Sequence, residues 1–253
     1  MIAVAATTLA QTIATADDRA SVVIRNIAVL QPSAAGWLTH RDIVVRNTTV
    51  SSIQPAGGDV PAAKIEINGD GKFAIPGLFD NRVDVARMTR EAAGLFIAYG
   101  VTSVHDASGD SPRVVDWRRE IANGKFMGPR LVASAGDRSG GVVPINGGNV
   151  GSGAIAPGLA FHDALAQLVS GGATPADALR RASIESARFH GRSHDLGSIE
   201  AGKIADLVIL TGDPLADISR TRAIDAVVFR GEALTRAHLN LLLARAASAT
   251  VRR

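Results

Sequence analysis

Hydrophobic positions between residues 21 and 75 alternate with polar ones or gather in short runs, which is the pattern of β-strands. The runs are rich in β-branched residues and are separated by Pro, Gly and Asn; they comprise Ser21–Leu30, Asp42–Arg46, Thr49–Gln54 and Lys64–Asn68. The segment Asn68–Gly71 (NGDG) has the composition of a tight hairpin turn. We therefore predict a strand-rich N-terminal region that contains a hairpin.

From residue 73 the pattern changes to strands that alternate with helices. The expected strands are Phe73–Phe79, Val101–His105 and Arg130–Ser134, and the helices between them are Thr89–Tyr99 and Arg113–Asn123. Each helix is followed by a glycine, which is a common helix terminator. Such alternation predicts parallel β/α units.

A segment rich in Gly, Asn, Ser and Pro follows, over residues 136–158. It is either an active-site lid or a span that replaces strands, because long loops of this kind are usually functional or mobile. After it we expect helices at Leu159–Ser170 and Pro175–Phe189, strands at Ile204–Leu210 and Ala223–Arg230, and a last helix near Arg236–Ala247. Thr174 and Pro175 form a typical helix start.

The composition of the 253 residues, 46% hydrophobic and 20% charged, is that of a globular protein. Aromatic residues are only 4%, so the core is mainly aliphatic, and no basic stripe interleaved with aromatics indicates nucleic-acid binding. The absence of cysteine excludes disulfides, thiolate metal sites and a cysteine nucleophile.

The first sixteen residues are small and apolar, and Ala14-Thr15-Ala16 resembles a signal-peptide cleavage site without a basic segment before it. A signal remnant implies a periplasmic or secreted protein, and an ordinary N-terminus implies a cytoplasmic one; the sequence leaves both open. No apolar run reaches the roughly 20 residues that a membrane span requires.

Five segments, in order, resemble the amidohydrolase family, and its imidazolonepropionase and prolidase-like branch in particular. They are Phe73–Asp80 (FAIPGLFD), Gly100–Asp106 (GVTSVHD), Gly128–Ala135 (GPRLVASA), Leu159–Leu168 with Gly172–Leu179 (GATPADAL), and Gly197–Leu210 (GSIEAGKIADLVIL). The resemblance implies an α/β fold: a partial TIM-like (β/α) barrel beside a small β-sandwich that the N- and C-terminal strands form together. We expect the sandwich at 21–75 plus 196–235, the barrel at 76–195, a C-terminal helix and tail at 236–253, and a signal remnant or disorder at 1–20.

The family's metal ligands are not found in this sequence. The resemblance implies one or two divalent metals held by a His-x-His pair after the first barrel strand, by later His and Lys or Glu residues, and by an Asp after the last strand. Here the His-x-His positions hold Arg82 and Asp84, and a guanidinium repels a cation. Gly148-Asn149-Val150 occupies the neighbourhood where that Asp is expected. We therefore expect no cofactor, although a divalent metal in a new geometry at Asp84, His105 and Asp106 stays an alternative.

The chain is also too short for a complete barrel, which takes about 250 residues or roughly 30 for each β/α unit. Residues 76–189 have space for three or four units, and four strands of the family's barrel have no counterpart. A fragment of this kind has unpaired edges, so we expect two copies to associate. The alternative is a single small three-layer domain.

If chemistry remains, it belongs at the carboxyl ends of the strands, where barrel enzymes place their active sites. The candidate catalytic residues there are Asp80, Arg82, Asp84, His105 and Asp106, and the candidate substrate-binding residues are Asp137, Arg138 and Asn149. A histidine beside carboxylates can act as general base while an arginine stabilises an oxyanion. The alternative is an ion-pair cluster of Arg82 with Asp80, Asp84 or Asp106, which is slightly favoured because the spacing has no catalytic signature of its own.

Other polar residues have simpler interpretations. His162 suits a structural role at a helix start, and His40 and His238 suit the surface. His190 and His194 have a spacing that would fit a metal on a helix, but Gly191 and Ser193 break the helix. Ser134 and Ser139 lack the Gly-x-Ser-x-Gly turn of a serine nucleophile.

Two functional hypotheses follow. One is a hydrolase of amidohydrolase descent with a rebuilt, metal-independent site for activated ester, lactone, amide or phosphotriester bonds. The other is a non-catalytic remnant that acts as a binding or structural protein. Both allow a small molecule and a second copy of the chain as partners, and neither involves nucleic acid or a membrane.

Overall fold

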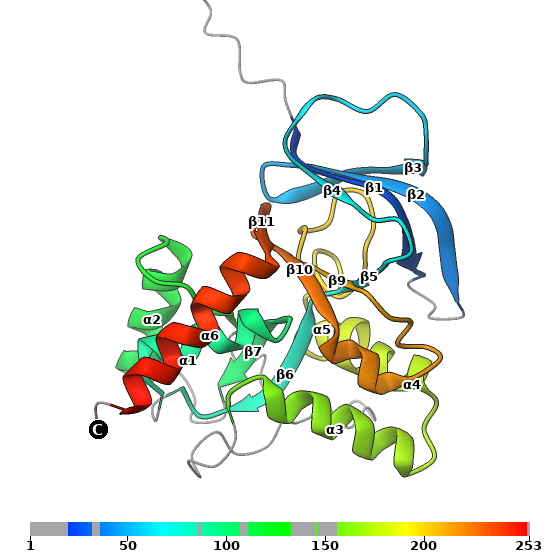
Figure 1. The fold of residues 1–253 in the computed structure, drawn as a ribbon. Coiled ribbons are helices and arrows are strands. Elements are labelled where there is room, and N and C mark those ends of the chain that lie inside the picture. The colour runs from blue at the N-terminus through cyan, green and yellow to red at the C-terminus, as the bar shows by residue number, and fades with distance from the viewer. Residues whose placement is uncertain are drawn as a thin grey trace, which may run out of the picture.

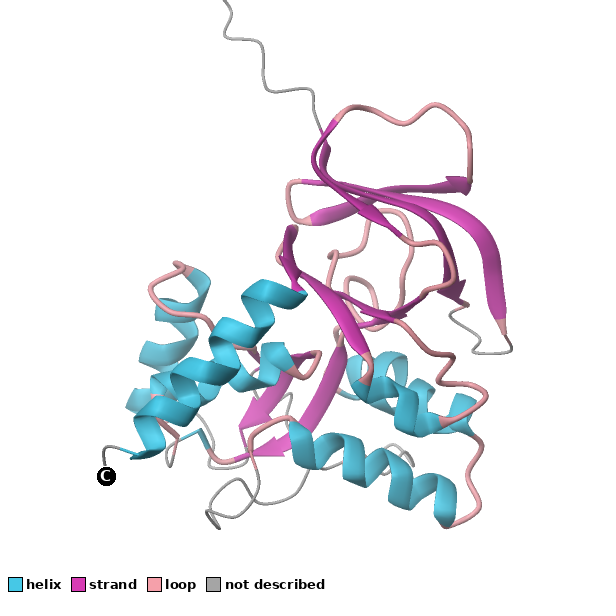
Figure 2. Ribbon diagram, in the orientation of Figure 1, coloured by secondary structure: helices cyan, strands magenta, loops and turns pink. Residues whose placement is uncertain are grey.

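The structure is a computed structural model that describes residues 20–31, 36–85, 88–106, 111–132, 145 and 156–251. Within this part of the chain the strands form an eight-stranded sheet and a separate three-stranded parallel sheet. Figures 1 and 2 show the larger sheet at one end of the molecule, and the smaller sheet among the helices at the other end. No helix in the described ranges is long and apolar enough to cross a membrane.

The eight-stranded sheet joins strands from the two ends of the chain, in the order β11-β10-β9-β5-β1-β2-β3, with β4 also paired to β1. The strands are β1 (Ala20–Leu30), β2 (Trp37–Arg46), β3 (Thr49–Pro55), β4 (Ala63–Asn68), β5 (Phe73–Pro76), β9 (Leu207–Leu210), β10 (Ile224–Phe229) and β11 (Glu232–Thr235). The N- and C-terminal groups meet where β5 pairs antiparallel with β9, with Ala74 opposite Ile209. The expected pairing of the terminal strands is confirmed.

One apolar core lies inside this sheet. Ile24 and Ile43 from the N-terminal strands share a cluster of buried residues with Leu207, Ile209 and Val228 from the C-terminal strands. The sheet therefore wraps around its own core, as the two layers of a sandwich would, although its strands are hydrogen-bonded in one continuous order.

The hairpin predicted at Asn68–Gly71 is wrong. Both β4 and β5 run parallel to β1, with Asn68 opposite Arg25 and Phe73 opposite Ala28. The turn instead carries the chain past an irregularity of β1, where Gly69 N donates to Arg25 O at 2.7 Å. A Cβ at Gly69 would lie 2.4 Å from that same oxygen, so the close approach requires glycine. Residues Asn68–Gly71 do form a turn, but the strands before and after it, β4 and β5, pair with β1 and not with each other.

The smaller sheet consists of β6 (Leu78–Val83), β7 (Val101–Asp106) and β8 (Arg130–Val132), all parallel. The strand predicted at Phe73–Phe79 is therefore two strands, because the chain passes from one sheet to the other at Gly77. A Cβ at Gly77 would lie 2.1 Å from Thr102 Oγ1, which explains why the crossing point is a glycine. Three β/α-type strands do not close a barrel, and this part of the structure is the expected partial barrel.

Helices surround the parallel sheet. Figure 1 shows α1 (Arg90–Ala98), α2 (Pro112–Ala122) and α6 (Arg236–Val251) on the β7 side, and α3 (Leu159–Ser170), α4 (Pro175–Arg180) and α5 (Ser186–Phe189) on the β6 side. Thr89, Ser111 and Thr174 accept a backbone N–H at the starts of α1, α2 and α4, as N-caps do. The helix predicted at Pro175–Phe189 is continuous but contains a π-helical turn, η2 (Arg181–Glu185).

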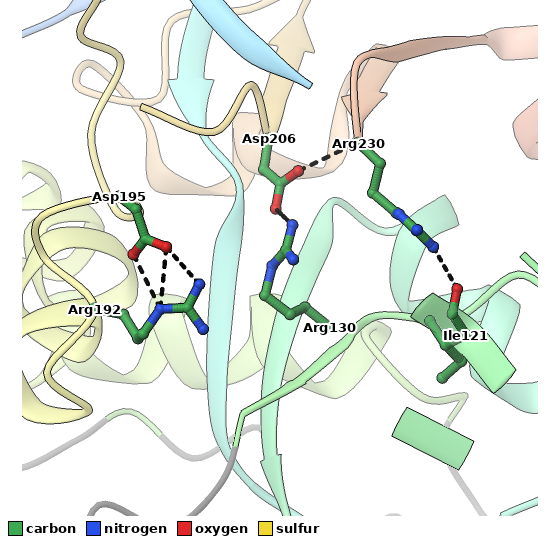
Figure 3. A network of polar contacts seen from close by, with 6 residues as sticks. All are labelled: Ile121, Arg130, Arg192, Asp195, Asp206 and Arg230. Carbon is green, nitrogen blue, oxygen red and sulfur yellow. Dashed lines mark hydrogen bonds and ion pairs between the residues drawn. The ribbon is translucent and has the colours of Figure 1, made fainter. Parts of the chain in front are cut away.

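A network of charged residues around the buried carboxylate of Asp206 joins the two sheets (Figure 3). Asp206, just before β9, accepts from Arg130 Nη2 of β8 at 3.2 Å and from the backbone N of Arg230 at 3.2 Å. The guanidinium of Arg230 reaches the carbonyl oxygens of Ile121 and Ala122 at the end of α2. Burial raises the pKa of Asp206, and the charge of Arg130 opposes that rise. The network thus fixes β8 and α2 to the eight-stranded sheet.

Candidate functional site

The residues that meet at the ends of β6 and β7 are two histidines and an asparagine. His105 of β7 stacks on His190, which follows α5, with ring centroids 4.8 Å apart and planes 30° apart. The ring of His190 also stacks on the ring of Phe79 of β6, with centroids 4.9 Å apart and planes 3° apart. Asn81 of β6 is hydrogen-bonded to both histidines, to His105 through its backbone oxygen and to His190 through its Oδ1. This group is the candidate functional site.

The hydrogen bonds of Asn81 fix which nitrogen of each ring carries the proton. His105 Nδ1 lies 3.2 Å from the backbone oxygen of Asn81, and a carbonyl can only accept, so Nδ1 carries a proton and Nε2 carries the lone pair of the neutral ring. The Asn81 amide nitrogen faces the oxygen of Ile145 at 3.1 Å, which leaves its Oδ1 as the acceptor. His190 Nε2 therefore donates to Asn81 Oδ1, at 2.9 Å.

Local helix geometry brings His190 to this place. The π-helical turn η2 is followed by Ser186, whose hydroxyl bonds Arg181 O at 2.5 Å and accepts from Asn81 Nδ2 at 2.9 Å. His190 lies one helical turn further on, with its N–H bonded to Ser186 O. Ser186 and His190 thus present the same helix face to Asn81. Single π-helical turns occur frequently at functional sites.

His190 is held in its neutral form. Its side chain is buried, and this burial lowers its pKa from 6.5 to about 4; a positive charge on His105, when that ring is protonated, acts in the same direction. Its Nδ1 is buried and has no hydrogen-bond partner among the described residues. Near neutral pH the ring is therefore an uncharged donor to Asn81 with a second nitrogen that carries a lone pair.

The predicted acidic residues hold the backbone of the strand ends. Asp80 accepts from the N–H of Arg82 at 3.1 Å, and Asp106 accepts from the N–H of Val85 at 2.8 Å. Both carboxylates are buried. Arg82 is exposed, and no ion pair between it and a carboxylate of the described ranges is found.

The pleat of the strands separates these candidates into two groups. Asp80 lies opposite Val104 in the β6–β7 register, and Phe79 lies opposite Ser103, so Asp80 points away from the face that carries Phe79. His105 shares the face of Ser103 because the two are two residues apart. The structure therefore brings His105 together with Asn81 and His190. Asp137, Arg138, Asn149, Ser134 and Ser139 lie outside the described residues.

The other histidines are where the sequence placed them. His40 and His238 are exposed, and His194 is 72% exposed. His162 is buried in α3, with Nε2 2.9 Å from Tyr99 O and Nδ1 2.9 Å from Thr221 Oγ1. Burial lowers its pKa from 6.5 to about 4. A structural role for His162 agrees with this fully bonded position.

Among the residues that the structure describes, the donors at the strand ends differ from those of the family's metal site. Arg82 stands at one His-x-His position, and Asp80 and Asp106 are engaged with backbone N–H groups. No group of three or more His, Asp or Glu side chains in the described part of the chain could hold a metal ion. We therefore derive no chemical step through a metal.

Sequence reasoning missed Asn81, Ser186 and His190 as members of the site. Asn81 stands between two candidate residues, Asp80 and Arg82, but an asparagine in a strand gives no chemical signal by itself. His190 was considered only as a metal ligand with His194, because its true neighbour His105 is 85 positions away. Proximity in the fold was the missing information.

Comparisons with known proteins agree with the resemblance. Residues 145–234 match the model of the amidohydrolase family. The chain has the fold of a protein assigned as a prolidase from Bifidobacterium longum, with a TM-score of 0.74 and 16% identity over 89% of this chain and 98% of that chain. A search of curated protein sequences finds no match.

Two further structures have the same fold. Molinate hydrolase is similar with a TM-score of 0.68 and 13% identity over 88% of this chain and 96% of that chain. An adenosine deaminase from Xanthomonas campestris with bound zinc is similar with a TM-score of 0.60 and 14% identity over 92% of this chain and 98% of that chain. The chain therefore shares its fold with these structures, and the resemblance to the amidohydrolase family is supported by the family-model match and by the prolidase-like structures.

Proposed function

We propose that the protein is a hydrolase of amidohydrolase descent, with a shortened barrel, in which His105 acts as a metal-independent general base. The observation that carries this proposal is the hydrogen bond from His105 Nδ1 to Asn81 O, which leaves the lone pair on Nε2. A neutral histidine in this tautomer has the form that a general base requires. The hydrolases among the structures of the same fold support the reaction class.

In the proposed reaction His105 Nε2 removes a proton from water as the water oxygen forms a bond to the substrate carbonyl or phosphoryl centre. The bond to the leaving-group oxygen or nitrogen then breaks, and the proton passes from His105 to the leaving group. Arg82 follows Asn81 in β6 and so lies on the Asp80 side of the pleat; its role as the cation that stabilises the oxyanion stays a prediction from the sequence. Activated esters, lactones, amides and phosphotriesters fit this chemistry because they need no metal to ionise the water.

The proposal is tested with p-nitrophenyl esters, lactones and p-nitrophenyl phosphotriesters, each with and without EDTA. We expect turnover that resists the chelator and falls by about 10²- to 10⁴-fold in His105→Gln, the usual contribution of a general base. His40→Gln is the matched control, because His40 is an exposed histidine of β2 outside the site. Its turnover should equal that of the wild type.

Two outcomes contradict the proposal in different ways. Turnover that disappears with EDTA contradicts metal independence and favours a metal bound by Asp84, His105 and Asp106. No turnover on any substrate favours the alternative of a non-catalytic binding or structural protein. One observation favours that alternative: the carboxylates of Asp80 and Asp106 bond backbone N–H groups, as residues that hold a fold together do.

A further inference from the structure

The buried position of His190 has a free-energy cost that its packing does not explain. Its side chain is 5% exposed, and its Nδ1 has no hydrogen-bond partner among the described residues. An unpaired buried polar atom generally destabilises a protein, and each such atom in a native structure needs an explanation. An apolar side chain would fill the space beside Phe79 without this cost. The histidine must therefore provide something that an apolar residue cannot.

The contacts of His190 show what it provides. Its Nε2 donates to Asn81 Oδ1 at 2.9 Å, and its ring stacks on His105 at 4.8 Å. The backbone oxygen of the same Asn81 receives the Nδ1 proton of His105. One side chain thus acts on His105 twice, directly through the ring and indirectly through Asn81.

The remaining contacts of Asn81 make the indirect path rigid. Its amide nitrogen donates to Ile145 O at 3.1 Å and Ser186 Oγ at 2.9 Å, and its backbone N donates to Ile145 O at 3.2 Å. His190 supplies the acceptor side of this amide. Without that donor the buried Oδ1 of Asn81 would lose its partner, and a flipped amide would set this oxygen against Ile145 O. Relief of this cost therefore requires Asn81 as a whole to shift, together with the carbonyl that receives the His105 proton.

We propose that His190 is a positioning residue for His105: through Asn81 and through ring stacking it holds His105 in the tautomer whose Nε2 carries the lone pair. This inference rests on the proposed function in one respect, since it gives His105 the role of general base. The tautomer itself is a property of the protein in the absence of substrate.

The contrast with His162 supports the assignment. His162 is also buried, but both of its ring nitrogens have partners, Tyr99 O and Thr221 Oγ1. Its contacts account for its presence as part of the core. His190 has one satisfied nitrogen, and that nitrogen bonds the residue that orients the proposed base.

The test measures the tautomer of His105 by NMR of ¹⁵N-labelled histidine in the full chain. In the wild type we expect the Nδ1–H form of His105. His190→Phe keeps an aromatic ring but removes the donor to Asn81, and should lower the ratio of the Nδ1–H to the Nε2–H form by about tenfold, the equilibrium effect of one hydrogen bond. His190→Gln keeps an amide donor without the ring and should give a smaller change. His162→Gln is the control that loses a buried histidine elsewhere, and should leave the His105 signals unchanged.

The inference is overturned if the wild type itself shows the Nε2–H form of His105, a result that needs no variant to fold. It is also overturned if His190→Phe and His190→Gln both leave the ratio as it is, or if His162→Gln changes it equally. For turnover, we expect kcat of His190→Phe to fall by about tenfold with KM unchanged, the sign of a misplaced base. A wild type without turnover but with the expected tautomers contradicts the proposed function and leaves the assignment of His190 in place.

Discussion

The eight-stranded sheet and the three-stranded parallel sheet are completed to different degrees. In the larger sheet, strands from both ends of the chain enclose a shared core of residues such as Ile24, Ile43 and Leu207. In the smaller sheet, β6 and β8 are outer strands with no further strand beside them in the described ranges. Both sheets thus have outer strands, but the larger one holds the shared apolar core, whereas His105 and His190 stack at the strand ends of the smaller one.

The largest effect that we expect concerns the two outer strands of the smaller sheet, β6 and β8. Each edge has a partial cover: Asn81 N donates to Ile145 O beside β6, and Arg118 Nε donates to Leu131 O of β8 at 3.1 Å. We propose that the remaining edge groups associate two copies of the chain. Light scattering after size-exclusion chromatography should then give twice the monomer mass of 26.2 kDa. A single monomer peak over a range of concentrations would show that the partial covers are sufficient.

Breaking the junction between the sheets should have the next largest effect. Asp206→Ala leaves the partly buried guanidinium of Arg130 without its carboxylate and Arg230 N without its acceptor. We expect the free energy of unfolding to fall by about 3 kcal/mol, as measured by urea denaturation. Asp116→Ala is the control, because the ion pair of Asp116 with Arg119 is exposed and should contribute well under about 1 kcal/mol. Equal losses in the two variants would mean that the junction does not hold the sheets together.

The buried histidine His162 should make stability depend on pH. Its pKa is lowered from 6.5 to about 4 in the folded state, so the folded protein binds fewer protons than the unfolded chain between these values. Its contribution is therefore fully present above about pH 6.5 and is lost as the pH falls towards 4, by about 3 kcal/mol in total. Urea denaturation at a series of pH values measures this slope. His162→Gln should be less stable at pH 7 and should show a flatter profile, and an unchanged slope would contradict the assignment.

The smallest expected effect is at the start of α2, beside β8. Ser111 Oγ accepts from Val114 N, and Ser111→Ala should cost about 1 kcal/mol of stability. Ser111→Asn retains a capping side chain and should lose only a fraction of this amount. If both variants are equally destabilised in urea denaturation, the cap is not the cause.

The sequence predicts the frame of this protein well, because the frame depends on local patterns. The caps at Thr174 and Pro175 mark a real helix start, and the β-branched runs at both ends form the strands that pair in one sheet. Alternation of apolar and polar residues indicates a strand with one buried face, and this pattern predicts the strands of the two terminal regions.

The candidate site could be predicted only in part. His105 was identified from its position after a strand, but the hairpin at Asn68–Gly71 and the single strand over Phe73–Phe79 were wrong, because each depends on a partner distant in sequence. The same reason hides His190, which reaches His105 through a π-helical turn that leaves no mark in the sequence. The roles expected for Asp137, Arg138 and Asn149 remain predictions.

The antiparallel pairing of β5 with β9 has a further consequence. It places Pro76 opposite Leu207, so the chain leaves the larger sheet and returns to it at neighbouring positions. Everything between them is an insertion whose two ends are fixed side by side by the frame. Because the entropy of closing a loop grows only slowly with its length, such an insertion can lose or gain whole β/α units at small cost to the frame. A longer barrel segment could therefore be inserted between Pro76 and Leu207 in place of the present one.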